Sequence, residues 1–155
     1  MTESTDRAPT AAAGGTSDLV LALEVDPSVE LLSCLRLAVR SALEAEETMT
    51  DDRIRTLLVS VTELATNAIE AHRRLDRRDR VRLELHHRPH HRVTVLVEDN
   101  GGGIDPRVLD AIGKQAPLST EHGLGLGLTV ATSLSDVRFH GRPGGTAAEI
   151  VVDLS

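Results

Sequence analysis

Two polar residues, Glu63 and Asn67, lie four positions apart in a segment whose apolar residues repeat with helical spacing. Residues four apart on a helix share one face and are separated by about 6 Å along its axis. An asparagine carbonyl oxygen is a hard ligand that suits Mg²⁺, an ion that keeps phosphate oxygens and waters in most of its coordination positions. A glutamate beside it can orient or deprotonate an attacking hydroxyl group. Alone, the pair is also typical of an ordinary polar helix border.

Asp99 follows a run of apolar residues typical of a strand, and Asn100 and three glycines come after it. A carboxylate accepts a hydrogen bond from the exocyclic amine of adenine but repels the carbonyl oxygen of guanine, so this position would select ATP over GTP. Gly101 and Gly103 would let the backbone pass close to a purine. The alternative is an ordinary strand-to-helix turn, in which Asp and Gly are common.

A third candidate segment alternates glycine with leucine, as Gly123, Leu124, Gly125, Leu126 and Gly127. At the start of a predicted helix, such a segment would turn backbone amides and the positive helix end toward phosphate groups. It differs from a Walker loop because no Gly-Lys-Ser/Thr follows, and it is a weak dinucleotide fingerprint because no strand precedes it. Since each glycine inside a helix costs about 1 kcal/mol, the pattern favours ligand binding over a flexible helix entry.

The elements that would hold these residues follow from hydrophobic spacing and turn signals. The pattern predicts a strand over 19–25, helices over about 28–47 and 50–72, strands over 81–85 and 93–97, helices over 105–112 and 123–135, and strands over 137–140 and 147–154. This order favours an α/β sandwich of the α+β type, whose mixed and mostly antiparallel sheet is covered by helices on one face. Residues 1–17 are rich in Ala, Thr, Ser and Gly and predict a disordered tail, which leaves 18–155 as the one expected domain.

Composition argues against several classes of function. The chain has a net charge of -7 and neither Trp nor Tyr, so it lacks the positive charge and the stacking platforms of a nucleic-acid binder. No apolar run approaches the roughly 20 residues of a membrane-spanning helix, and the polar N-terminus is unlike a signal peptide. Cys34 is the only cysteine, which fits a reducing compartment. We therefore expect a cytoplasmic protein that contacts neither membrane nor nucleic acid directly. Separately, Cys34 follows the apolar stripe of the first predicted helix, and we expect it to be buried as a small hydrophobic residue.

Two further clusters are interpreted as solvated surface. Four histidines surround Pro89 in a predicted hairpin tip, at positions 86, 87, 90 and 91. Adjacent residues of a strand point to opposite faces, so at most half of these imidazoles could converge on a metal. The basic stretch from Arg73 to Arg80 is interpreted as an exposed turn, with an acidic protein partner as the alternative.

In order and spacing, these segments together resemble the GHKL ATPases, whose fold is the Bergerat-type ATP-binding fold. The matching segments are the N box Glu63–Asn67, the first glycine box Asp99–Gly103, the second glycine box Gly123–Gly127, and a closing Gly144-Gly145-Thr146 before the last strand. The resemblance covers about residues 19–154. Within the superfamily the chain is most similar to the stand-alone bacterial anti-sigma factor serine kinases, single short domains in which a strand and a helix lead directly to the N box.

The resemblance implies ATP and Mg²⁺ as cofactors and a role for each matching residue. Asn67 would ligate Mg²⁺, and Glu63 would be the catalytic base on the substrate hydroxyl. Asp99 would bind the adenine amine with support from Thr146. The backbone around the base would be shaped by Gly101 and Gly103.

The resemblance also implies how the phosphates would be held. Their contacts would come from Lys114, in an ATP lid formed by residues 113–122, and from Gly123, Leu124, Gly125, Leu126 and Gly127. The lid departs from the family pattern, because Glu121 and His122 stand where anti-sigma kinases usually carry an arginine.

The function implied by the resemblance is that of an anti-sigma factor with ATP-dependent serine/threonine protein kinase activity. It would bind a sigma factor, phosphorylate an anti-anti-sigma factor, and form a homodimer. One alternative is a detached histidine-kinase catalytic domain that phosphorylates a histidine on another chain. A second alternative is a non-catalytic nucleotide-binding module that acts by docking. The altered lid favours the docking module, and the intact Glu63 argues against it.

Overall fold

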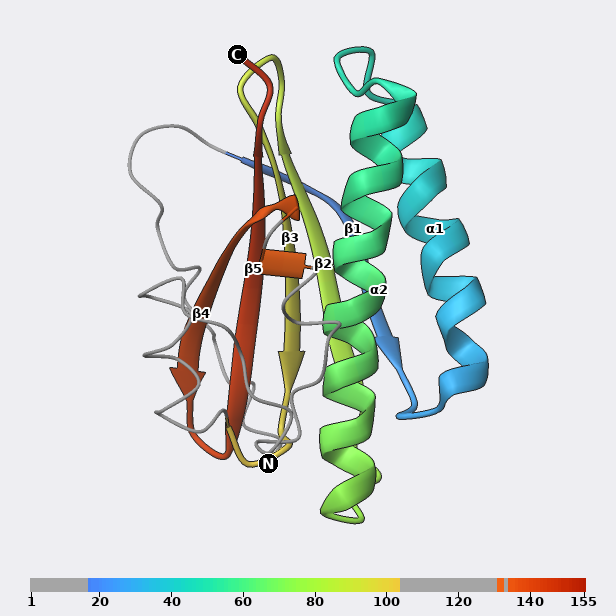
Figure 1. Ribbon diagram of the computed structural model, residues 1–155, viewed down its shortest axis with the longest axis vertical. Helices are drawn as coiled ribbons and strands as arrows, with labels where there is room; N and C mark the ends of the chain where they lie inside the picture. Colours follow the sequence, from blue (N-terminus) through green and yellow to red (C-terminus); the bar gives the residue numbers. More distant parts are fainter. Residues whose placement is uncertain (1–16, 104–130, 133) are drawn as a thin grey trace, which may run out of the picture.

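The computed structural model describes residues 17–103, 131–132 and 134–155, and Figure 1 shows their arrangement as a sheet with helices against it. In chain order the elements are β1 Asp18–Val25, the 3₁₀ turn η1 Val29–Leu31, α1 Leu32–Glu44, α2 Asp51–Arg74, β2 Val81–Arg88, β3 Arg92–Asp99, β4 Asp136–Arg142 and β5 Gly145–Asp153. The strands form one five-stranded sheet in the order β1-β2-β3-β5-β4. Every neighbouring pair is antiparallel, so the sheet in the described residues is antiparallel throughout rather than mixed.

Helix α2 is 24 residues long and packs over β3, β5 and β2. Thr50 caps its N-terminus, where the threonine Oγ1 accepts a hydrogen bond of 3.3 Å from the Arg53 N–H. Asp51 and Asp52 occupy the first turn, where negative charge complements the positive helix end. Helix α1 lies beside α2 and packs against it and β1 (Figure 1). Both helices therefore cover one face of the sheet, as the sequence predicts.

The core between these helices and the sheet is aliphatic. Alternate residues of β2 and β3 are buried: Val81, Leu83, Leu85, Val93, Val95 and Val97. Because successive strand residues point to opposite faces, this alternation determines which of them face the helices. The chain contains one aromatic residue, Phe139, and it is only partly buried at the margin of this core.

The C-terminal end of α1 differs from the sequence prediction, since the helix ends at Glu44 rather than near position 47. The turn that follows is closed by the Glu46 carboxylate, which accepts hydrogen bonds from the Thr48 N–H at 3.2 Å and from the Thr48 hydroxyl at 2.7 Å. Met49 is buried immediately after this turn. The Glu46 carboxylate thus satisfies the Thr48 N–H in place of a helical carbonyl oxygen, in the turn where the chain leaves α1.

The prediction that Cys34 is buried is wrong, because its side chain is exposed. The buried stripe of α1 runs through Leu35, Val39 and Leu43, at intervals of four. A residue next to this stripe in sequence points about 100° away from it around the helix. The hydrophobic character of cysteine alone therefore does not predict whether the Cys34 side chain is buried.

The hairpin between β2 and β3 is longer than predicted, and His86 and His87 belong to β2. Imidazole Nε2 of His86 lies 2.8 Å from a Glu84 carboxylate oxygen, and His87 lies against the Glu46 carboxylate. His90 lies in the connecting loop with a φ of 58°, a left-handed conformation that recurs in three-residue hairpin loops.

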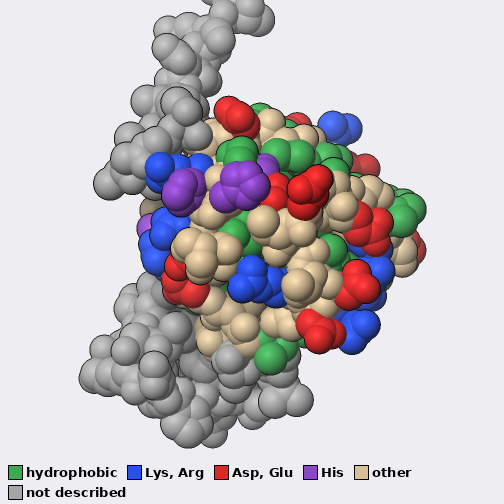
Figure 2. Space-filling model, turned by 90° about the horizontal axis from the view of Figure 1, so that it is seen from above, with side chains coloured by type: hydrophobic (Ala, Val, Ile, Leu, Met, Phe, Trp, Pro, Cys, Tyr) green, Lys and Arg blue, Asp and Glu red, His purple; other side chains and the backbone are tan. Residues whose placement is uncertain are grey.

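Histidine side chains gather at the end of the molecule where this hairpin turns (Figure 2). Among the described residues, no group of three or more His, Cys, Asp or Glu side chains is arranged to hold a metal ion. The first two histidines are thus half-buried partners of carboxylates, whereas His90 and His91 are exposed as predicted.

Some predictions concern residues outside the described ranges. These are residues 1–16 of the predicted tail, the helix over 105–112, and most of the helix over 123–135, of which 131, 132 and 134 are helical. Within the described ranges, no helix combines the length and the apolar character needed to cross a bilayer.

Candidate functional site

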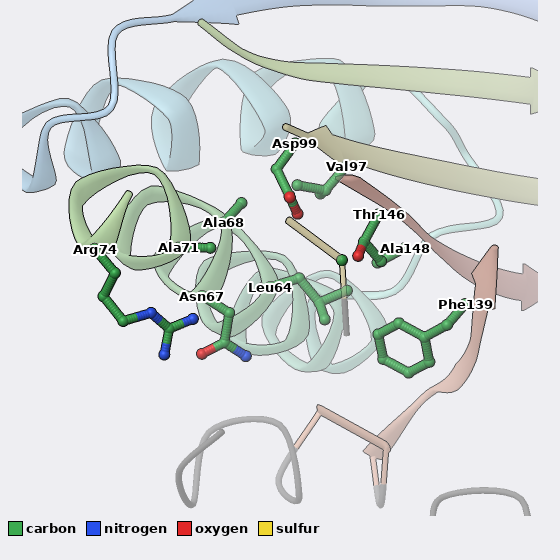
Figure 3. A pocket seen from close by; sticks show the side chains of 11 residues that line it. Leu64, Asn67, Ala68, Ala71, Arg74, Val97, Asp99, Phe139, Thr146 and Ala148 are labelled. Atoms are coloured by element: carbon green, nitrogen blue, oxygen red, sulfur yellow. The ribbon is translucent and has the colours of Figure 1, made fainter. Parts of the chain in front are cut away.

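A cavity lies between α2 and the ends of β3, β4 and β5 (Figure 3). Its lining consists of Leu64, Asn67, Ala68, Ala71, Arg74, Val97, Asp99, Gly103, Phe139, Thr146 and Ala148. Four of these residues, Asn67, Asp99, Gly103 and Thr146, are candidates from the sequence. Three segments that are far apart in the chain thus bring them to one cavity.

Helix α2 forms one wall of the cavity because its lining residues recur at intervals of three and four and share a face. Ala68 and Ala71 have small side chains, which leave room in front of the helix. The loop after β3 packs directly on this face, since a Cβ atom at Gly101 would lie 2.4 Å from the Ala71 Cβ. Gly101 is therefore required by the contact between loop and helix, and of the two predicted base-pocket glycines only Gly103 belongs to the lining.

Asp99 is the last residue of β3 and pairs in register with Thr146 near the start of β5. Directly paired residues of an antiparallel sheet point to the same face, so these side chains lie together. Asp99 Oδ1 accepts a hydrogen bond of 2.8 Å from the Gly101 N–H. Burial raises the pKa of the Asp99 carboxyl group, while hydrogen bonds from the backbone of Gly101 and Thr146 oppose that rise. The carboxyl group is therefore oriented and partly desolvated before a ligand binds.

The start of β5 approaches the end of β3 so closely that a side chain cannot fit between them. A Cβ atom at Gly145 would lie 1.8 Å from the Asp99 carbonyl oxygen. The Gly102 N–H donates a hydrogen bond of 2.9 Å to the Gly144 carbonyl oxygen. These two glycines of β5 and its turn therefore fix Thr146 beside Asp99.

Asn67 lies on the α2 wall, and its buried Nδ2 has no hydrogen-bond partner among the residues that the structure describes. Nearly all buried polar groups in folded proteins have a partner, so such an atom needs an explanation. An anionic ligand in the cavity would accept its hydrogen bond, and the carboxamide oxygen of the same side chain is a ligand of the kind that Mg²⁺ takes. The chemistry of this residue thus fits a site for a metal-bound phosphate.

Glu63 lies one turn before Asn67 on α2 and is partly exposed. It is not among the described residues that line the cavity. The phosphate-binding predictions concern residues outside the described ranges, namely Lys114, Gly123, Leu124, Gly125, Leu126 and Gly127. The geometry therefore brings the candidate for metal binding, Asn67, to the same cavity as the candidates for adenine binding. The proposed catalytic base, Glu63, lies beside this cavity and outside its wall.

Among the lining residues that were not candidates from the sequence, one carries a charge and one an aromatic ring. Arg74, which was assigned to an exposed basic turn, is the last residue of α2, and Figure 3 shows its side chain extending toward Asn67. Its spacing of seven from Asn67 puts both residues on one helix face, a signal that the sequence did contain. Phe139 reaches the cavity from β4, where it pairs with Ala148. That position follows only from the order of the strands, which the sequence does not state.

The fold and the cavity define an α/β sandwich domain with a cavity at the helix-covered face of its sheet, and comparisons with known proteins identify the family. The family model described as Histidine kinase-like ATPase domain matches residues 25–152. The chain therefore belongs to this family, and membership implies that it binds ATP. A comparison with curated protein sequences gives no match.

Solved structures show the same fold at low sequence identity. A chain of the SiaB–SiaC complex from Pseudomonas aeruginosa superimposes with a TM-score of 0.65 at 14% identity, over 86% of this chain and 89% of that chain. A structure of the RsbU and RsbW domains of Rv1364c from Mycobacterium tuberculosis gives a TM-score of 0.57 at 18% identity, over 84% of this chain and 30% of that chain. The mycobacterial sensor histidine kinase MprB gives 0.50 at 20% identity, over 84% and 97% of the two chains. The predicted Bergerat-type ATPase fold is thereby confirmed.

Proposed function

We propose that this protein is an anti-sigma factor with ATP-dependent serine/threonine protein kinase activity, which binds a sigma factor and phosphorylates an anti-anti-sigma factor. One observation carries the proposal: Asn67 of α2 and Asp99 of β3 line the same cavity. Support comes from membership in the Histidine kinase-like ATPase family and from the likeness of the fold to a chain that contains an RsbW domain. The spacing of the sequence boxes, which resembles that of anti-sigma kinases, supports the choice of protein partners.

The adenine of ATP would occupy the end of the cavity that contains Asp99 and Thr146. The free acceptor capacity of the Asp99 carboxylate would receive the hydrogen bond of the exocyclic amine, with Thr146 beside it. Val97, Ala148 and Phe139 offer apolar surface to the base. A few oriented polar groups among apolar walls are typical of sites for small molecules.

The phosphates would extend toward Asn67 and Arg74, on the α2 side of the cavity (Figure 3). Asn67 would hold Mg²⁺ through its carboxamide oxygen and donate its unpartnered Nδ2–H to a phosphate oxygen. When bound, the ion would neutralise charge on the phosphates during transfer. The Arg74 guanidinium would add a second positive charge, in a protein whose lid lacks the usual arginine.

Glu63 would act on the substrate protein rather than on the nucleotide. Its carboxylate would take the proton of a serine or threonine hydroxyl while that oxygen bonds to the γ-phosphorus. The bond from phosphorus to the bridging oxygen breaks, and ADP leaves. Partial exposure outside the cavity wall leaves Glu63 accessible to a hydroxyl group that a second protein brings.

The experiment that tests the function has two stages. First, the thermal midpoint of the full chain is measured with ATP, with and without Mg²⁺. A ligand at 100 times its dissociation constant stabilises a protein by about 2.7 kcal/mol. Second, ATP labelled in its γ-phosphate is mixed with the protein and with candidate anti-anti-sigma proteins.

Each outcome of the labelling stage has a distinct meaning. Label on a serine or threonine of the second protein supports the proposal. Acid-labile label on a histidine would replace it with a histidine kinase, and ATP binding without any transfer would replace it with a docking module. Absence of nucleotide binding would contradict both the kinase and the docking module.

A further inference from the structure

A buried histidine, His72, occupies the last turn of α2, five residues after Asn67. Its relative exposure is 0%, which is unusual for an imidazole at the end of a helix. The cavity lining does not include it. A titratable group that is fully buried next to a candidate site needs hydrogen-bond partners to offset the cost of its burial.

Both ring nitrogens of His72 have backbone partners from different segments. Nδ1 lies 3.0 Å from the carbonyl oxygen of Asp79, in the connection between α2 and β2. Nε2 lies 2.8 Å from the backbone nitrogen of Asn100, in the first glycine box. The same two segments meet again where the Asn100 side-chain amide donates to the Asp79 carboxylate, a contact that lowers the pKa of Asp79.

These partners determine the protonation of the ring. A backbone N–H can only donate, so the nitrogen that faces Asn100 must be the acceptor. A carbonyl oxygen can only accept, so the nitrogen that faces Asp79 must carry the proton. His72 is therefore neutral and carries its proton on Nδ1.

The hydrogen bond between His72 Nε2 and the Asn100 N–H fixes the residue that directly follows Asp99. The Asn100 N–H belongs to the peptide unit that follows Asp99, and the Gly101 N–H holds Asp99 Oδ1 at 2.8 Å. The loop is also packed on α2 through the contact of Gly101 with Ala71. His72 thus fixes one peptide unit of the segment that presents the Asp99 carboxyl group to the cavity.

We propose that His72 is a positioning residue for base selection: its neutral ring joins α2 to the first glycine box and thereby orients Asp99 toward the exocyclic amine of a purine. The inference rests on the proposed role of Asp99 as the group that distinguishes ATP from GTP. His72 itself touches neither nucleotide nor substrate. Its effect is to hold the acceptor where the adenine amine arrives.

Two amide substitutions separate the acceptor from the rest of the ring. The amide of glutamine overlays the Nε2 end of a histidine, so His72→Gln retains an acceptor for the Asn100 N–H. The amide of asparagine overlays only the Nδ1 end, so His72→Asn retains a partner for Asp79 and leaves the Asn100 N–H without one. His90→Asn, on the exposed hairpin loop, is the matched control.

The experiment measures ATP and GTP affinities of the full chain by calorimetry, with Mg²⁺ present, for the wild type and these three variants. In the free His72→Asn variant the loop can reorient and so avoid the cost of about 1–3 kcal/mol for an unsatisfied buried donor. Binding needs the original orientation of Asp99 and must restore that cost, so ATP affinity should weaken by roughly 5–150-fold. The ratio of ATP to GTP affinity should fall in the same variant. His72→Gln and His90→Asn should keep ATP affinity within about threefold of the wild type.

The ratio distinguishes positioning from a general loss of structure, which would weaken both nucleotides alike. If His72→Asn binds ATP and GTP with the wild-type ratio, the inference is overturned while the proposed function stands. If the wild type itself binds neither nucleotide, the proposed function fails instead.

A measurement on the unaltered protein keeps the inference testable if His72→Asn does not fold. The nitrogen chemical shifts of the His72 ring should report a neutral imidazole protonated at Nδ1, and the Asn100 amide should exchange slowly with solvent. A ring protonated at Nε2, or an Asn100 amide that exchanges as fast as an exposed loop amide, would overturn it.

Discussion

The two ends of the cavity differ in how their polar groups are hydrogen-bonded in the protein without a ligand. We call the end that contains Asp99 and Thr146 the base end, because the adenine base is proposed to bind there, and the end that contains Asn67 and Arg74 the α2 end. At the base end, Asp99 receives the Gly101 N–H at 2.8 Å, and the neighbouring Asn100 N–H is bound to His72. At the α2 end, the buried Asn67 Nδ2 finds no partner within the described part of the chain. Arg74 extends over this end from the last turn of the helix (Figure 3).

This difference separates a preorganised recognition surface from one that a ligand completes. A group whose position is fixed by other hydrogen bonds loses little freedom on binding and can discriminate between bases. A buried amide without a partner costs free energy until a ligand supplies one. The base end is therefore expected to provide selectivity, and the α2 end is expected to provide affinity that depends on phosphates and metal.

The largest effect is expected for Glu63, which belongs to neither end of the cavity. Glu63→Ala should lower the rate of phosphoryl transfer by roughly 10²–10⁴-fold, because a positioned general base contributes about that much. ATP affinity should stay near the wild-type value. Single-turnover assays with labelled ATP measure the first quantity, and calorimetry measures the second. The matched control is Glu70→Ala, an exposed glutamate on the same helix, and transfer by Glu63→Ala at the wild-type rate would contradict the assigned role.

Asn67→Ala tests whether the α2 end is completed by a metal-bound ligand. Affinity for Mg²⁺-ATP should fall by about 100-fold or more, since both a metal ligand and a phosphate donor are lost. The difference from wild type should shrink when Mg²⁺ is chelated. The apo protein should be no less stable, because the substitution removes a buried unsatisfied amide. Calorimetry with and without chelator checks the prediction, with Thr66→Ala as control, and a loss that is independent of Mg²⁺ would argue against metal ligation.

Asp99→Asn tests the selectivity of the base end. One amide oxygen can still accept the Gly101 N–H, but the NH₂ group then faces the amine of adenine. Losing a hydrogen bond to a charged acceptor should weaken ATP binding by roughly 10–100-fold and GTP binding by less. Calorimetric titration with both nucleotides measures the ratio. An unchanged ratio would show that another residue distinguishes the bases.

The same substitution has a consequence for stability without ligand. Because burial raises the pKa of Asp99 above its ordinary value of 3.8, the folded protein binds this proton more tightly than the unfolded chain does. The contribution of Asp99 to stability is therefore present at pH below that value and is lost as pH rises through the raised pKa. Asparagine does not titrate, so the variant should gain stability relative to wild type at neutral pH and lose that advantage in acid. Thermal midpoints measured across this pH range check the sign.

The smallest effect is expected for Arg74, which is exposed at the mouth of the cavity. Arg74→Ala should weaken ATP binding by roughly 3–10-fold, and the loss should diminish at high salt because exposed charges are screened. Affinity for adenosine, which has no phosphates, should not change. Arg73→Ala is the matched control, and an equal loss for adenosine and ATP would place Arg74 at the base instead of the phosphates.

Much of the fold and part of the site could be predicted from the sequence, for physical reasons that the errors make clear. The stripe of α2 and the strand before Asp99 are local patterns, and local periodicity reveals them. The contact of His72 with Asn100 joins residues 28 positions apart and depends on how the helix end lies against the sheet. His86 lies two positions after its partner Glu84 on one face of β2, so that contact is a local signal that the interpretation of a solvated tip overlooks. The contact of His87 with Glu46 joins two segments that no local pattern connects. Contacts of this kind are set by tertiary packing, which composition and spacing do not encode.

The single aromatic side chain of this protein, Phe139, lines the cavity. With neither tryptophan nor tyrosine in the chain, the protein contributes almost no fluorescence of its own. A fluorescent nucleotide could therefore be titrated against a nearly dark background. In a proton NMR spectrum recorded in D₂O, where exchanged amide protons give no signal, the five ring protons of Phe139 share the aromatic region with the ring protons of seven histidines. A change in the chemical shifts of the Phe139 ring protons on adding nucleotide would report how much of the cavity is occupied, without any added label.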